Sequence, residues 1–190
     1  MSNDRLQQLD EQLALLREQR HGMEKAKITA AAEEKVRIGQ RIKLEIRPQI
    51  LEIEKEYWGI LANQAESLDI TEQEAEVVVS EIVIQVEQIE ARNPPRYPDQ
   101  VLELLREIKY AVNQPGKPAS AKLKGIISSF PPFIGVAYEA ELDTESFVLT
   151  HFPTFTKVIK QMTKKNPIPK LLWQQLDLRR LATENHQSST

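Results

Sequence analysis

Histidines and acidic side chains are the residues of this chain that could do chemistry, and their spacing limits what that chemistry is. The 190 residues include three histidines, His21, His151 and His186, and no cysteine. Without cysteine, disulfides, cysteine-ligated zinc, iron–sulfur clusters and thiol nucleophiles are excluded. The histidines lie far apart in sequence, and no two of them have the spacing of metal ligands. We therefore expect no enzymatic activity and no cofactor or metal.

His151 is the histidine with the most suggestive neighbours, Phe152 and Pro153. Its imidazole could titrate near neutral pH. No nucleophile or paired carboxylate can be assigned to it, and the chain has neither a glycine-rich phosphate loop nor a glycine-flanked serine. A structural or surface role is therefore favoured over a catalytic one.

Four alternating acids form the other candidate chemical feature, at Glu139, Glu141, Asp143 and Glu145. Carboxylates in such a row could bind a hard cation. A loop glycine and further oxygen ligands are missing around them, so we favour a solvent-facing strand edge that discourages aggregation.

A row of leucines near the amino end is the clearest interaction signal. Leu6, Leu9, Leu13 and Leu16 recur at steps of three and four, with polar residues between them. This spacing draws a narrow apolar seam on a helix, and such a seam needs a partner helix. We predict that these four leucines bind a partner.

The element that carries the seam is a long helical segment over residues 4–66, which we expect to fold back as an antiparallel hairpin. The turn lies near Gly22 or near Thr29, and we prefer Thr29 because threonine can cap the second helix. Pro48 predicts a kink or a fresh helix start. Tyr57 and Trp58 either anchor the hairpin to the rest of the chain or begin a binding hot spot, and both join the predicted partner-binding residues. The helical segment also carries charges of alternating sign, such as Glu52, Glu54, Lys55 and Glu56. We interpret them as parts of a solvated helix face.

The middle of the chain predicts two helices. Thr71 and Glu74 match a capping box, so a helix should begin at Glu72. The β-branched run Val77–Val86 would suit a strand by propensity, but its apolar spacing and the preceding cap favour a helix. A second helix is predicted from Pro98 to about Asn113.

The last third opens with a loop at Gln114–Pro118 and a short helix over 119–128. Residues 136–142 alternate between apolar and acidic side chains, which makes them the best strand candidate. Asp143 or Thr144 should cap a short helix, and Pro153 should restart another. A further helix is expected over 171–181, followed by a polar, disordered end.

Charge is unevenly distributed along the chain. The net charge is −3, but residues 69–112 hold ten acidic and four basic side chains, whereas residues 113–190 hold ten basic and six acidic ones. The cationic surface of the last helices could bind nucleic-acid phosphates or an acidic protein face, or simply aid solubility, and no nucleic-acid motif accompanies it. The candidate polyanion-binding residues are Lys157, Lys160, Lys164, Lys165, Lys170, Arg179 and Arg180.

Several short segments of the chain belong together as a pattern: Glu34–Ile38 through Glu56–Trp58, Glu74–Val79, Gln114–Pro118, Glu141–Glu145 and Phe152–Phe155. Together they resemble the helical effector-associated modules of bacterial signalling and conflict proteins. Such modules sit beside NTPase, protease-like or TIR effector domains and serve as adaptors. The resemblance implies a stand-alone adaptor that pairs with a similar module on an effector, and it carries no catalytic residue.

The sequence thus predicts a mainly α protein, with an N-terminal coiled-coil hairpin (1–66), a compact helical domain with at most a small β element (67–165), and a C-terminal helix with a polar tail (166–190). No signal peptide or membrane-spanning stretch is evident, so we expect a cytoplasmic protein. The expected function is non-catalytic protein–protein interaction, through self-association or with another protein. The alternative is nucleic-acid binding by the basic C-terminal helices.

Overall fold

The computed structural model describes residues 2–92 and 96–165, and within these ranges the chain is helical, with no β-strand. The predicted mainly α class, with an N-terminal helical hairpin followed by a compact helical domain, is confirmed. None of the described helices is both long enough and apolar enough to cross a membrane. The predicted helix over 171–181 and the polar end lie outside the described residues.

The hairpin consists of α1 (Ser2–Thr29), α2 (Ala32–Arg41), a π-helical turn (Ile42–Ile46) and α3 (Arg47–Gln64). The chain therefore turns just after Thr29, as predicted. The proposed cap is wrong, because Ala31 precedes α2 and the Thr29 hydroxyl instead donates back to the Ala26 carbonyl at 3.4 Å.

Pro48 lies in the first turn of α3, directly after the π-helical turn. A proline lacks the amide that an α-helix would use there, and its ring collides with the carbonyl four residues earlier. The wider π turn is a common irregularity at such points. The expected kink or fresh start at Pro48 takes the form of this π-helical irregularity, and the backbone stays helical from α2 through Pro48 into α3.

After a short 3₁₀ turn (Ala65–Ser67), the chain forms α4 (Glu72–Glu90) and α5 (Asp99–Val112). The capping box is present in full: the Thr71 hydroxyl accepts the Glu74 amide, and the Glu74 carboxylate accepts the Thr71 amide. The β-branched run lies within α4, where Val78, Ile82 and Val86 are buried. Tertiary burial on one helical face has overridden strand propensity.

The predicted strand over 136–142 is wrong, because α6 (Ala119–Glu139) includes its first four residues and Ala140 is the C-cap of that helix. The helix also continues through Pro131 and Pro132, well beyond the predicted short helix over 119–128. Internal prolines cost a helix ~3 kcal/mol or more. Here the residues around them are core residues, and burying them offsets that cost; they include Phe130, Phe133, Ile134 and Ala137.

The last described helices are α7 (Thr144–His151) and α8 (Pro153–Lys165). Asp143 caps α7, since its side chain accepts the Ser146 amide at 3.0 Å. Pro153 starts α8, as predicted.

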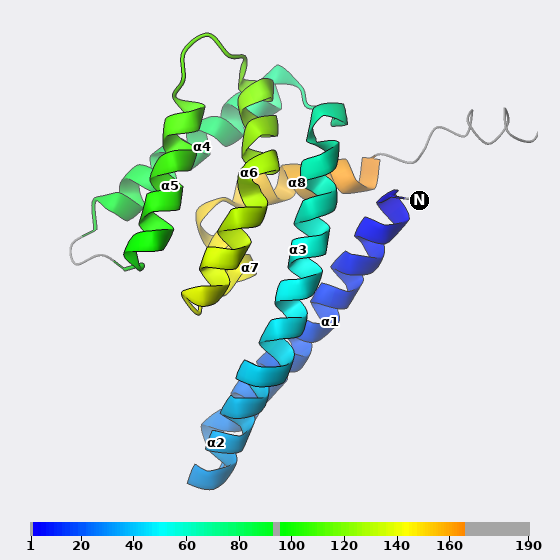
Figure 1. Ribbon diagram of the computed structural model, residues 1–190, viewed down its shortest axis with the longest axis vertical. Helices are drawn as coiled ribbons and strands as arrows, with labels where there is room; N and C mark the ends of the chain where they lie inside the picture. Colours follow the sequence, from blue (N-terminus) through cyan, green and yellow to red (C-terminus); the bar gives the residue numbers. More distant parts are fainter. Residues whose placement is uncertain (1, 93–95, 166–190) are drawn as a thin grey trace, which may run out of the picture.

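One end of the hairpin packs against helices α4 to α8, which we call the body, and the other end lies outside it. In the body, α4, α5, α7 and α8 lie around the central α6, and together these helices lie beside one half of α3. Helix α2 and the adjoining parts of α1 and α3 extend beyond them (Figure 1). The main core combines Leu6, Leu9 and Leu61 of the hairpin with apolar residues of α4 to α8. A separate small cluster, formed around Leu13, Ile46 and Ile50, holds the middle of the hairpin together.

Candidate functional site

The seam leucines are covered within the chain. Leu6, Leu9 and Leu13 are at most 3% exposed, and Leu16 is half-buried. Helix α3 packs antiparallel along α1, and Leu6 and Leu9 also belong to the main core with residues of α4 to α8. Leu6, Leu9 and Leu13 could therefore meet another chain only if the hairpin opened, and their predicted role in partner binding would require that change.

Tyr57 and Trp58 lie where the hairpin meets the body. Tyr57 is buried, and burial raises the pKa of its phenol to about 12, so that it stays neutral. The half-buried Trp58 ring lies 4.0 Å from the Phe130 ring of α6 and stacks at 6.0 Å on Phe155 of α8, measured between centroids. Both residues therefore occupy anchor positions, and Trp58 also lines a surface cleft.

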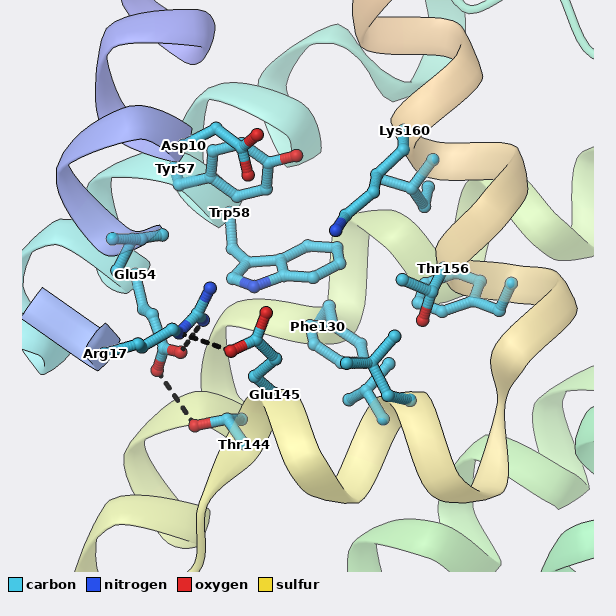
Figure 2. Close-up of a pocket in the computed structure, with 15 residues that line it drawn as sticks. Asp10, Arg17, Glu54, Tyr57, Trp58, Phe130, Thr144, Glu145, Thr156 and Lys160 are labelled. Carbon is cyan, nitrogen blue, oxygen red and sulfur yellow. Dashed lines mark hydrogen bonds and ion pairs between the residues drawn. The ribbon is translucent and has the colours of Figure 1, made fainter. Parts of the chain in front are cut away.

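A charged network joins the hairpin to the start of α7 (Figure 2). At its centre is Glu54, which is 3% exposed. Its carboxylate accepts hydrogen bonds from the Arg17 guanidinium at 2.7 Å and from the Thr144 hydroxyl at 2.9 Å. Arg17 also lies 3.1 Å from Glu145, and Arg20 pairs with Asp143. We call these six residues, Arg17, Arg20, Glu54, Asp143, Thr144 and Glu145, the charged clasp.

Burial raises the pKa of Glu54 above its ordinary value of 4.5. Desolvation is the largest cause, because it disfavours the ionised carboxylate. The neighbouring Arg17 charge and the hydrogen bond from Thr144 oppose this shift, and Asp143 adds to it. Glu54 is therefore a buried carboxyl at the junction of hairpin and body whose ionised form is disfavoured.

The interpretation of Glu54 as part of a solvated face is wrong. Glu54 lies four residues after Ile50 and three before Tyr57, both of which are buried. This places it on the inward face of α3, and its position in the apolar register was the available signal. Its partner in α7, Thr144, lies 90 residues along the chain, and no local pattern identifies it.

The four acids at 139–145 do not form a strand edge, because they surround the turn between α6 and α7. Glu141 pairs with Lys43 at 2.9 Å, Asp143 with Arg20, and Glu145 with Arg17. Arg47 also donates to the Tyr138 carbonyl at 3.1 Å. Among the described residues, no group of histidine and acidic side chains is placed to hold a metal ion.

His151 occupies a structural position. It is 5% exposed, and its Nε2 lies 2.7 Å from the Tyr97 hydroxyl. Its pKa is lowered, chiefly by burial and further by the nearby charges of Arg92 and Arg96. The imidazole connects the segment just before α5 to α7 among aromatic rings, including that of Phe147.

The seven candidate polyanion-binding residues are only partly placed by the structure. Lys157 and Lys160 are exposed on α8. Lys164 and Lys165 end that helix, but their side chains lie outside the described part, as do Lys170, Arg179 and Arg180 altogether.

The far end of the hairpin presents an uncovered surface. We call residues 24–41 the hairpin tip; none of them is buried. Ile28 is 74% exposed and Val36 61% exposed. Nearer the body, Leu15 and Leu44 are 67% and 70% exposed. The spacing of the seam leucines does not indicate this surface, because it lies outside the seam.

Comparison with protein-family models, curated proteins and solved structures finds no match for this chain. The resemblance to effector-associated modules therefore stays a prediction.

Proposed function

We propose that the protein is a non-catalytic adaptor that couples to an effector or signalling partner through helical surfaces. The observation that supports this most strongly is the hairpin tip, which extends from the body and contains no buried residue. Two helices that pack only on each other cannot bury apolar side chains on their outer faces. Ile28 and Val36 are two such residues.

The partner that suits this surface is a helix, or a helical pair, of another protein. A third and fourth helix laid against a hairpin complete a bundle and bury the outward apolar residues. The tip carries charges of both signs, with Glu33, Glu34 and Arg37 close together on α2. Exposed pairs of this kind contribute little affinity, but they favour one register of the partner helix over others.

The test is affinity capture from the source cell, followed by titration of the purified partner. The test variant is Ile28→Lys with Val36→Lys. The control is Val77→Lys with Tyr110→Lys, which changes two equally exposed apolar residues on the body, 58% and 73% exposed. We expect the tip variant to weaken binding about tenfold or more, as loss of interface anchors does, and the control to bind as the unaltered chain does.

Capture of the same partner by the tip variant with unchanged affinity would contradict the assignment of the tip. Leu9→Asp with Leu13→Asp is unsuitable for this test, because both leucines lie in the interior and their replacement would unfold the hairpin.

A further inference from the structure

A second uncovered surface lies away from the hairpin tip, between the end of α7 and the start of α8. A groove of about 360 Å³ is lined by Leu149, Pro153, Thr156, Lys157, Lys160 and Gln161. Leu149, Thr156 and Lys160 also line the cleft at Trp58, so the groove and the cleft are continuous. We call the two together the α7–α8 groove.

The cleft end of this groove is apolar at its floor. Trp58 lies there with Phe130 and Phe155 beneath it, and Leu149 at the rim is 44% exposed. The cleft itself holds only about 70 Å³, well below the roughly 300–1,000 Å³ of pockets that enclose whole small molecules. It suits a single apolar side chain that reaches in from a longer ligand lying in the open groove.

The open end of the groove is cationic. Lys157 and Lys160 are exposed and lie nearly one turn apart on α8. Within the described part of the chain, neither lysine forms an ion pair. Figure 2 shows the Lys160 side chain directed toward the Trp58 indole.

The carboxylates of the cleft lie on its other wall. Glu54 and Glu145 are both paired with Arg17, and Asp10 lies beyond them near Tyr57. Phosphates would be repelled by Asp10 at that end, and the aromatic rings that line the cleft are buried or, at Trp58, half-buried, so they offer no open face to a base. These charges favour a peptide, with its acids near α8, over a nucleic acid.

We propose that the α7–α8 groove binds a segment of another protein in which a large apolar side chain is flanked by carboxylates. The apolar side chain contacts Trp58 and Leu149, and the carboxylates accept hydrogen bonds from Lys157 and Lys160. This surface is separate from the hairpin tip, and it supplies the second contact that an adaptor needs to join two proteins.

The probe is a library of synthetic ten-residue peptides with Leu, Ile or Phe fixed at the fifth position and the other positions randomised. It is panned against the full chain, and selected peptides are then titrated. The chain has two tryptophans, and replacement of Trp173 by phenylalanine leaves only Trp58. The fluorescence of this variant therefore reports occupation of the cleft. We expect selected peptides to carry Asp or Glu within four residues of the fixed position and to change that fluorescence.

Lys157→Glu with Lys160→Glu should weaken these peptides about tenfold or more, as loss and reversal of two charge-assisted contacts does. The matched control, Lys55→Glu with Lys117→Glu, changes the net charge equally at two exposed lysines elsewhere and should leave affinity unchanged. Equal thermal unfolding midpoints of the two variants would show that both are folded.

Failure to select any peptide, selection of basic peptides, or unchanged affinity in Lys157→Glu with Lys160→Glu would overturn the proposal. Binding of a twenty-nucleotide single strand that only this double variant loses would reassign the surface to a polyanion. Tight binding of a synthetic peptide of residues 166–190 would reassign the occupant to the chain's own end. None of these outcomes depends on the hairpin tip, so the proposed function is tested separately.

Discussion

At the scale of single residues, Glu54 is the side chain whose environment departs most from its residue type. A carboxylate at 3% exposure loses its hydration and needs charged and hydrogen-bonding partners, which Arg17 and Thr144 provide. The pKa of Glu54 is nevertheless raised, so desolvation outweighs these partners. Its ionised form is therefore a cost to the folded state that protonation removes.

This cost predicts how stability depends on pH. Because the folded chain holds the Glu54 proton more tightly than the unfolded chain, the free energy of unfolding falls as pH rises from 4.5 through the raised pKa. Glu54→Gln cannot ionise, so we expect it to lack this fall. The check is chemical denaturation of both proteins between pH 4 and pH 7.5.

The quantity to compare is the difference in unfolding free energy between the unaltered chain and Glu54→Gln at each pH. His151 has a lowered pKa and imposes the opposite slope below its ordinary value of 6.5, but it does so equally in both. Carboxylates with lowered pKa values act below 4.5 and also cancel; they are Glu56, Glu72, Glu90 and Glu141. Parallel stability curves for the two proteins would show that Glu54 titrates normally.

At the scale of elements, the end of α6 determines the course of the chain into α7. The Leu142 amide donates to the Ala137 carbonyl at 2.8 Å and the Glu141 amide to the Tyr138 carbonyl at 3.0 Å, the bond pattern of a Schellman motif. Glu141 has φ of 57°, the left-handed conformation that usually falls to glycine. The turn thus presents the acids 141–145 to the hairpin.

This conformation predicts that Glu141→Gly is more stable than Glu141→Ala. Both substitutions remove the exposed pair with Lys43, but only glycine relieves the crowding of Cβ at positive φ. We expect the glycine variant to unfold ~2–4 °C above the alanine variant in a thermal melt. Equal midpoints, or a lower one for glycine, would mean that the left-handed conformation at Glu141 is not strained.

At the scale of the whole molecule, burial is distributed unevenly along the hairpin. Where the hairpin meets α6 and α8, it shares the main core, whereas at its tip no residue is buried. Local opening of a segment costs less free energy when it exposes less apolar surface. The molecule therefore combines a cooperative body with a loosely held tip.

Amide hydrogen exchange should show this difference directly. We expect amides of residues 24–41 to exchange on the order of 100-fold or more faster than those of the middle of α6, because opening the tip breaks no core contact. The measurement is exchange followed by mass spectrometry of proteolytic fragments. Equal protection in the two segments would contradict the picture of a loosely held tip.

The sequence by itself determined the local features of this protein. The leucine spacing predicted the helical hairpin, and the capping box at Thr71 predicted the start of α4. The turn was placed correctly near Thr29, although Thr29 does not cap α2. These signals were sufficient because helix periodicity, turn residues and caps act over a few neighbouring positions.

Only the tertiary structure decided the rest. Most of the segment 136–142, predicted as a strand, forms the end of α6. Burial of Phe133, Ile134 and Ala137 outweighs both the alternating pattern and the cost of two prolines inside that helix. The tertiary structure also brought Arg17 and Glu54 to Thr144 and Glu145, and it joined Trp58 to a groove between α7 and α8. Contacts between residues about 90 or more positions apart depend on how helices pack, and packing is a property of the whole chain that no local spacing records.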